Sequence, residues 1–133
     1  MTPITLIDND YATLYYDPDL KLVYHIFHRP ISGTAFQEVL NRGTQALQEY
    51  QADKWLSDDR NNMALPHEDL DWAINIWFAQ TQAAGWKYWA LVVPPNIDAQ
   101  ISLTKSVQHA TQEGVRTRVF VDPAAALKWL QSL

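Results

Sequence analysis

Short runs of branched, aromatic and other apolar residues alternate with helix-length segments over most of the chain, and this alternation constrains the fold more than any other feature. The runs beyond residue 50 are "KWLSD" at 54–58, "YWALVV" at 88–93 and "VRTRVFV" at 115–121. A segment with apolar residues at helical spacing follows each run. Strand–helix–strand units have right-handed crossovers and place successive strands parallel to each other. The sequence therefore predicts a sheet with a parallel portion.

The part of the chain before residue 30 has a different pattern, in which only turns separate the strand-like runs. The runs are "ITLID" at 4–8, "ATLYYD" at 12–17 and "LKLVYHIFH" at 20–28, and the residues between them are turn formers such as Asn9-Asp10. This pattern predicts an antiparallel meander. The third run is apolar on both alternating sets of side chains, which is typical of a central strand covered on both faces.

Four segments have the spacing and the end signals of helices. Asn96 and Asp122 stand where N-caps are expected, and Gly85 and Gly114 stand where helices should end. The predicted helices cover residues 34–52, 66–84, 97–113 and 123–133. In the third helix one apolar stripe is formed by Ile97, Ile101, Thr104, Val107 and Thr111. We therefore predict one α/β domain over residues 1–133, with a mixed β-sheet and the order β-β-β-α-β-α-β-α-β-α.

Composition excludes several classes of protein. The 133 residues are 47% hydrophobic, which suffices for one buried core, and the absence of cysteine excludes disulfides, thiolate zinc sites and cysteine nucleophiles. A net charge of −5 with dispersed basic residues argues against nucleic-acid binding. No uncharged stretch approaches the roughly 20 residues that cross a bilayer. We expect a cytoplasmic protein without membrane insertion.

The order of elements and several short motifs resemble the STAS domain superfamily, the fold of the anti-sigma-factor antagonists. The motifs are "KWLSDDR" before a helix that contains "EDLDWAINIW", and the closing "VFVDPAAALKWL". More narrowly, the chain is similar to single-domain STAS-like (SpoIIAA-like) proteins, in which a strand ending "F-x-D" precedes a helix with "A-x-x-W-L". The matching residues are Phe120, Asp122, Ala126, Trp129 and Leu130.

The resemblance implies a regulatory function, but the loop at 58–69 departs from the family pattern. In the antagonists a serine or threonine at the start of the following helix accepts phosphate. Here that helix starts with Pro66-His67-Glu68-Asp69, which has no hydroxyl, and Ser57 lies upstream at the strand end. Glu68 and Asp69 already bring negative charge to the first turn and would oppose a phosphate. We expect no phosphorylation switch in this loop.

The same loop offers candidate ligand-contacting residues in Asp58, Arg60 and His67, because ligands bind at the carboxyl ends of strands in open α/β sheets. An enzyme would need all three near one substrate. A structural ion pair between Asp58 and Arg60 is the alternative. The sequence "HEDLD" lacks the second histidine of a zinc-protease helix. Five side chains could instead surround magnesium or calcium, although an acidic helix start explains them equally: Asp58, Asp59, His67, Glu68 and Asp71. We predict no catalytic residue, no metal and no cofactor.

The remaining histidines favour structural interpretations. His25 and His28 lie on the third strand and point to opposite faces, so they do not form a pair. Each is interpreted as a hydrogen-bonded structural histidine, and His109 is expected on the exposed side of its helix. There is no G-x-S-x-G motif for serine–histidine catalysis.

The helix at 66–84 has two apolar stripes at about 100° per residue. One is formed by Leu70, Ile74, Trp77, Phe78 and Thr81, and the other by Trp72, Ile76 and Ala83. One sheet cannot bury both. Either neighbouring helices cover the second stripe, or it is a partner surface centred on Trp72 and Ile76.

The sequence supports two functional hypotheses. The first is a non-catalytic interaction or regulatory module that lacks the usual phosphoacceptor serine and binds itself, as a homo-oligomer, or another protein. The second is a carrier of a small molecule or lipid, which the many aromatic residues suggest and which would require an apolar cavity.

Overall fold

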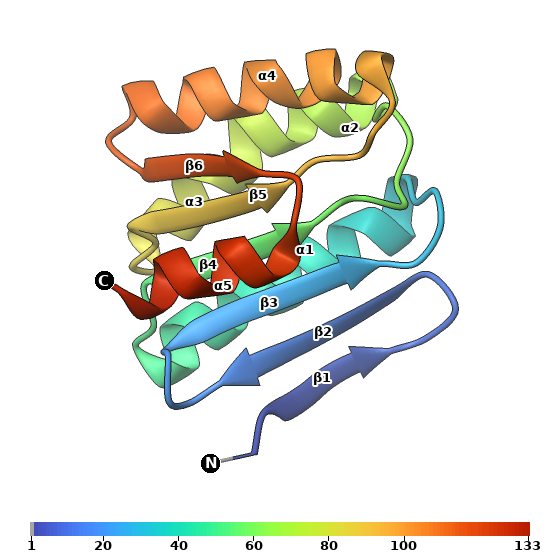
Figure 1. The fold of residues 1–133 in the computed structure, drawn as a ribbon. Helices are drawn as coiled ribbons and strands as arrows, with labels where there is room; N and C mark the ends of the chain where they lie inside the picture. The colour runs from blue at the N-terminus through green and yellow to red at the C-terminus, as the bar shows by residue number, and fades with distance from the viewer. Residues whose placement is uncertain (1) are drawn as a thin grey trace.

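The chain folds as an α/β domain in which helices cover both faces of a mixed β-sheet (Figure 1). We describe a computed structural model, which covers residues 2–133. The predicted α/β class and the mixed sheet are confirmed. Within the described residues, no helix is long and apolar enough to cross a membrane.

The sheet has six strands in the spatial order β1-β2-β3-β4-β5-β6. The first three strands pair antiparallel, and the pairs β3–β4, β4–β5 and β5–β6 are parallel. Consecutive strands are therefore neighbours throughout, and β1 and β6 are the two edges. The strands are β1 (Ile4–Asp8), β2 (Ala12–Asp17), β3 (Leu22–Phe27), β4 (Lys54–Asp58), β5 (Tyr88–Val92) and β6 (Arg116–Phe120).

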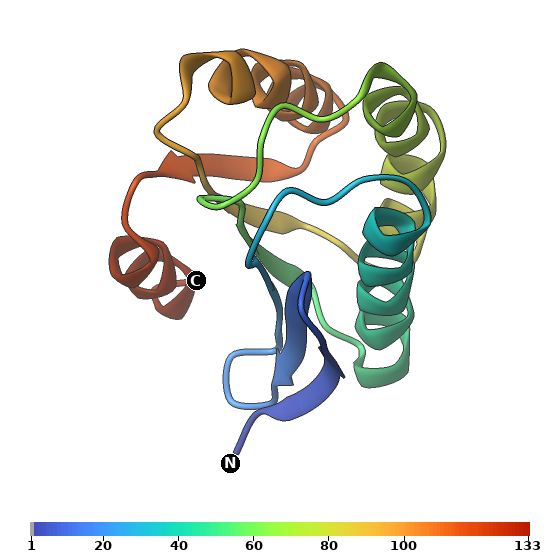
Figure 2. The same cartoon turned by 90° about the vertical axis from the view of Figure 1, so that its right-hand side faces the viewer.

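The helices are divided unequally between the two faces of the sheet (Figure 2). One face carries α5 alone, and all the others lie on the opposite face. Asn96 and Asp122 cap α4 and α5 through their side-chain oxygens, as predicted. The helices are α1 (Gly33–Tyr50), α2 (His67–Trp72), η1 (Ala73–Trp77), α3 (Phe78–Ala83), α4 (Ile97–Gln112) and α5 (Pro123–Gln131).

Two hydrophobic cores lie on either side of the sheet. The smaller core joins α5 to the sheet through residues such as Ala126, Leu130 and Leu56. The larger core lies under the other helices and is dominated by aromatic rings. In it, the Trp55 and Trp77 rings have centroids 5.1 Å apart and meet edge to face, a favourable geometry for aromatic pairs.

Helix α1 approaches the sheet closely at Gly43. A Cβ atom at this position would lie 2.8 Å from Cζ2 and 2.9 Å from Cζ3 of Trp55, and it would overlap Cη2. The Trp55 side chain is fully buried. Only glycine lets the indole lie against the helix backbone here.

The predicted helix at 66–84 forms at this position, but it is not a uniform α-helix. Residues Ala73–Trp77 form a π-helical turn between α2 and α3. A π turn inserts an extra residue, so a fixed 100° step assigns the residues beyond it to the wrong angle. The predicted first stripe nevertheless stays buried or half-buried on both sides of the turn, whereas the second stripe is divided. Trp72 is half-buried against α1, whereas Ile76 and Ala83 are exposed.

The apolar stripe on α4 is not the buried face of that helix. The buried residues are Ala99, Leu103, Ser106 and Ala110. Three of these four side chains are small, while the larger Ile97 and Ile101 are 71% and 60% exposed. Hydrophobicity alone pointed to the wrong face of α4, because the buried face of this helix carries mainly small side chains.

Candidate functional site

Asp58 and Arg60, two of the predicted ligand-contacting residues, form a bidentate ion pair at the end of β4. Arg60 Nε donates to Asp58 Oδ1 at 2.9 Å, and Arg60 Nη2 donates to Asp58 Oδ2 at 2.8 Å. The Asp58 side chain is 2% exposed and that of Arg60 is 44% exposed. The hydrogen bonds that Arg60 donates to Asp58 raise the pKa of Arg60 above its usual value. Both carboxylate oxygens are thus occupied, which favours a structural role for the pair.

His67, the third predicted residue of this group, lies apart from the ion pair. It is exposed at the first position of α2, and over residues 2–133 it forms no hydrogen bond with Asp58 or Arg60. The enzyme hypothesis needs the three side chains together, and among the described residues only Asp58 and Arg60 are joined by hydrogen bonds. The five-residue cation site is not assembled either. In the described part of the chain no three histidine or acidic side chains group as metal ligands.

A buried polar relay lies beside the ion pair, in the larger core. His25 Nε2 is 2.8 Å from Asp59 Oδ1, and Trp55 Nε1 donates to His25 Nδ1 at 3.0 Å. An indole nitrogen is only a donor, so His25 Nδ1 must be the acceptor. The proton of the neutral ring is therefore on Nε2 and is donated to Asp59. This geometry defines one tautomer of His25.

The relay confirms that His25 is a hydrogen-bonded structural histidine. Both ring nitrogens are occupied, and His25 and Asp59 are 2% and 6% exposed. A general base needs a free nitrogen within reach of a substrate, and His25 offers none. His28 is separate, with Nε2 2.8 Å from Thr13 Oγ1 at the surface. His109 was predicted to be exposed but is half-buried, with its ring 5.2 Å from that of Phe78.

Two more side chains of the 58–69 segment hold the chain that enters α1. Asn62 Oδ1 accepts from Ile31 N at 3.1 Å and from Met63 N at 2.9 Å. The Asp69 carboxylate accepts from Gly33 N at 3.2 and 3.1 Å, and so it caps α1 from a neighbouring helix. Sequence reasoning missed these roles, as it missed the His25–Asp59 pair, because each joins residues more than 30 positions apart. The loop is chiefly a structural connection.

Tyr24 lies on the α5 face of the sheet near Asp58. Burial raises the pKa of Tyr24 above its ordinary value of 10.0, and the charges of Tyr15 and Asp58 raise it further. The rings of Tyr24 and Tyr15 are 4.8 Å apart. The native state therefore keeps this proton at a pH where the unfolded chain has lost it.

This difference predicts a loss of stability at alkaline pH. Above about pH 10 the unfolded state binds fewer protons than the native state, so the free energy of unfolding falls as pH rises. At neutral pH both states are protonated and the effect is absent. We expect the free energy of unfolding of Tyr24→Phe to fall less steeply with pH than that of the parent between about pH 9 and 11, as measured by denaturant titrations. Tyr11→Phe, at an exposed ring, is the matched control, and identical slopes in parent and Tyr24→Phe would contradict the prediction.

The predicted partner surface on the second helix is only partly exposed. The Trp72 ring lies 6.0 Å from that of Phe36, edge to face, so α1 covers one side of it. Ile76 is 46% exposed. Trp72 is therefore only partly accessible, and Ile76 is the more exposed of the two residues.

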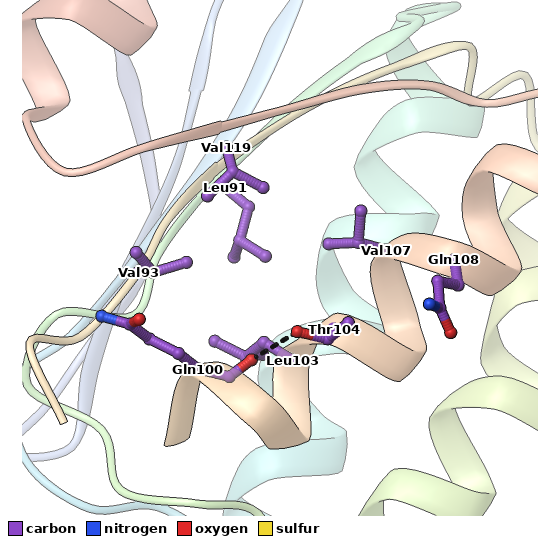
Figure 3. Close-up of a pocket in the computed structure, with 8 residues that line it drawn as sticks. All are labelled: Leu91, Val93, Gln100, Leu103, Thr104, Val107, Gln108 and Val119. Carbon is purple, nitrogen blue, oxygen red and sulfur yellow. Dashed lines mark hydrogen bonds between the residues drawn. The ribbon is translucent and has the colours of Figure 1, made fainter. Parts of the chain in front are cut away.

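A groove between α4 and the β5–β6 end of the sheet has a larger apolar surface (Figure 3). Its volume is about 320 Å³. Leu91 and Val119 of the sheet face Leu103 and Val107 of α4 across it, as Figure 3 shows. Thr104 Oγ1 donates to the Gln100 carbonyl oxygen at 2.9 Å. The lining residues are Leu91, Val93, Gln100, Leu103, Thr104, Val107, Gln108 and Val119.

Exposed apolar side chains lie on α4 and at β6, two of the elements that line this groove. Val119 and Val121, in and just after β6, are 48% and 80% exposed, and Ile97 and Ile101 are exposed on α4. We call the groove and these four residues the α4–β6 surface. A second hollow of about 390 Å³, which includes Arg60, shares Val93 and Gln100 with the groove. Contiguous exposed apolar area of this kind marks interaction sites in folded proteins.

Comparisons of the chain with protein-family models, with curated proteins and with solved structures found no match. The fold and the site themselves describe an α/β domain with a mixed sheet, a structural loop at the end of β4 and an exposed α4–β6 surface.

Proposed function

We propose that this chain is a non-catalytic protein-interaction domain that binds its partner through the α4–β6 surface. The observation that carries the proposal is the exposure of Ile97, Ile101, Val119 and Val121 on α4 and at β6, two of the elements that line the groove. Burial of such side chains by a partner is favourable at about 25 cal/mol per Å² of apolar area. Catalysis has no comparable support, because the buried carboxylates and His25 are engaged with each other or with backbone and arginine donors.

The STAS-like assignment is part of the same proposal. Its support is the succession of a meander and strand–helix units, with "F-x-D" at 120–122 and "A-x-x-W-L" at 126–130. In this scaffold the chain would act as a regulatory module without phosphorylation, since the loop before α2 has no hydroxyl at the helix start. The acids there have other tasks, as Asp69 caps α1.

Site-specific photo-crosslinking tests the proposal. We would insert p-benzoylphenylalanine at Ile101 and, in a separate protein, at Ile76, which is a second exposed isoleucine on a different helix. After irradiation in the cells that make the chain, we expect a protein–protein adduct from position 101 and none from position 76. Circular dichroism of both purified proteins establishes that they fold.

The alternative outcomes are distinct. An adduct from position 76 alone would move the interaction to the helix that carries Trp72 and Ile76. The absence of any adduct at either position would contradict a protein-binding function. An adduct at 101 supports it whether the captured protein is another copy of this chain or a different protein.

A second candidate function is binding of a small apolar molecule or lipid chain in the groove. Its volume of about 320 Å³ is at the lower end for ligand pockets, and Gln108 and Thr104 add polar groups to an apolar lining. Native mass spectrometry of the purified chain would detect such a molecule as a mass shift. The shift should disappear in Val107→Trp, whose indole fills the groove. A chain without bound mass, also after incubation with fatty acids, argues against this function.

A further inference from the structure

The two edges of the sheet differ in how they are protected from pairing with another strand. Exposed edges are usually blunted by bulges, by charged side chains, by proline, by short strand length or by a covering segment. The β1 edge has a register shift between Thr5 and Ile7, whereas β6 pairs with β5 in unbroken register. The β6 sequence "RTRVF" has no proline, and its two charged residues, Arg116 and Arg118, are those that a pairing strand would have to accommodate. The open edge of β6 is therefore the one suited to strand pairing.

The backbone groups of β6 show which residues face this open edge. Arg116 N donates to Lys87 O at 2.9 Å, and Phe120 O accepts from Val93 N at 2.9 Å. The N–H and C=O groups of Arg116, Arg118 and Phe120 therefore point toward β5. Those of Thr117 and Val119 alternate with them and point outward, away from the sheet.

We propose that a second copy of this chain occupies the α4–β6 surface and pairs its β6 antiparallel to β6, with the two Val119 residues directly opposite each other. The inference rests on the proposed protein-binding function of this surface and names its partner. In this register the two Val119 residues exchange backbone hydrogen bonds, and Thr117 exchanges them with the partner's Val121. The result is a closed two-fold dimer with one continuous sheet.

Charge and the missing N–H of Pro123 together select this register among those that the outward-facing residues allow. A register centred on Arg118 would place the two Arg118 residues opposite each other, and one centred on Phe120 would pair Thr117 with the partner's Pro123, which has no N–H to donate. With Val119 at the centre, Arg116 lies opposite the partner's Asp122, and Arg118 lies opposite the partner's Phe120. Arg118 already stacks on its own Phe120, with its guanidinium carbon 5.7 Å from the ring centroid. A register centred on Thr117 would instead place Arg116 opposite the partner's Arg118, and like charges at such positions are destabilising. A register centred on Val121 would run into Pro123, which has no N–H to donate.

The same register also covers the apolar residues around the groove. The two-fold axis is perpendicular to the sheet, so α4 of each copy lies on the same side of the joined sheet. Because α4 packs beside β6, the two α4 helices become neighbours across the axis. Ile97 and Ile101 can then be buried with the rim of the partner's groove, which gives the hydrophobic contribution that strand pairing alone lacks.

Disulfide trapping tests the register directly, because the chain has no cysteine of its own. In purified Val119→Cys the two sulfurs face each other, and we expect a covalent dimer under oxidised glutathione. Thr117→Cys is the matched control. In this variant the two introduced cysteines lie four residues apart along the paired strands, which is about 13 Å. A disulfide allows a Cα separation of only about 4.4 to 6.8 Å. Thr117→Cys mixed with Val121→Cys should form the crosslinked heterodimer.

Sedimentation velocity tests the charge pairing without cysteines. The unmodified chain should sediment as a dimer. Arg116→Glu places a like charge against Asp122 twice in a symmetric dimer, so we expect its dissociation constant to rise roughly tenfold or more. Asp122→Asn should weaken the dimer less, and it keeps a side-chain oxygen for the Ala124 N–H of α5. Arg29→Glu makes the same charge change on the loop after β3 and should leave the dimer intact.

Several results would overturn the inference. The first is an unmodified chain that stays monomeric. The second is a disulfide-linked dimer that forms as readily in Thr117→Cys alone as in Val119→Cys. The third is an equal effect of Arg116→Glu and Arg29→Glu on the dissociation constant of the dimer. If the purified chain is monomeric but position 101 captures a different protein, the second-copy assignment fails and the interaction function stands. If there is neither a dimer nor an adduct, both fail.

Discussion

We expect Gly43→Ala to lower the free energy of unfolding by about 2 to 3 kcal/mol, although alanine is the better helix former. Helix propensity alone would raise stability by about 1 kcal/mol. The added methyl group, however, would overlap the six-membered ring of Trp55. That indole is fully buried and is held by its hydrogen bond to His25, so it has no free space to move into. Overpacking therefore outweighs propensity. Urea denaturation followed by far-UV circular dichroism measures the difference.

Trp55→Phe provides the control for this prediction, because the smaller ring leaves room for a methyl group. The double variant Gly43→Ala/Trp55→Phe should lose less stability than the sum of the two single variants, since the clash is absent from it. Additive losses, or a Gly43→Ala protein as stable as the parent, would mean that the indole does not lie against the α1 backbone.

The second large effect is expected for His25→Leu, which should lower the free energy of unfolding by about 3 kcal/mol or more. Leucine fills a similar volume but leaves the Asp59 carboxylate and the Trp55 N–H without their partner. A buried charge that loses its hydrogen-bond partner is costly, because water does not replace it. Denaturant titration at neutral pH measures the loss.

His28→Leu is the matched control, since it makes the same substitution at an exposed ring, and it should change stability by no more than about 0.5 kcal/mol. Asp59→Asn should be milder than Asp59→Leu, because the amide oxygen can still accept from His25 Nε2. Long-range 1H–15N correlation spectra should identify Nε2 as the protonated nitrogen of His25. A His25→Leu protein as stable as His28→Leu would refute the relay.

Strands, helices and their order could be predicted because they depend on residues close together in the sequence. The spacing of apolar residues predicted the strands with little error, and Asn96 and Asp122 marked two helix starts correctly. These signals are local, since a cap or a turn involves neighbours in the chain. The α/β class followed from them, because strand–helix–strand units have few allowed connections.

The errors arose where a partner distant in the sequence determines the outcome. On α4 the sheet selects a face of small side chains, and hydrophobicity indicated the opposite side with Ile97 and Ile101. On the second helix, α1 covers one side of Trp72 and leaves Ile76 exposed, so a distant segment divides the predicted second stripe. The sequence showed that the loop after β4 is rich in acidic residues. Only the folded structure shows that Asp58 pairs with Arg60 and that Asp59 pairs with His25.

The candidate site follows the same division. Residue types near the end of β4 pointed to Asp58, Arg60 and His67, and the folded chain joins the first two and leaves His67 apart. The α4–β6 surface was not predicted, because exposure depends on which neighbours a side chain meets. Backbone preferences and periodicity act over a few residues and so decide the elements. Close packing and buried hydrogen bonds act between segments that only the folded chain brings together, and they decide which polar groups are occupied and which apolar groups stay free.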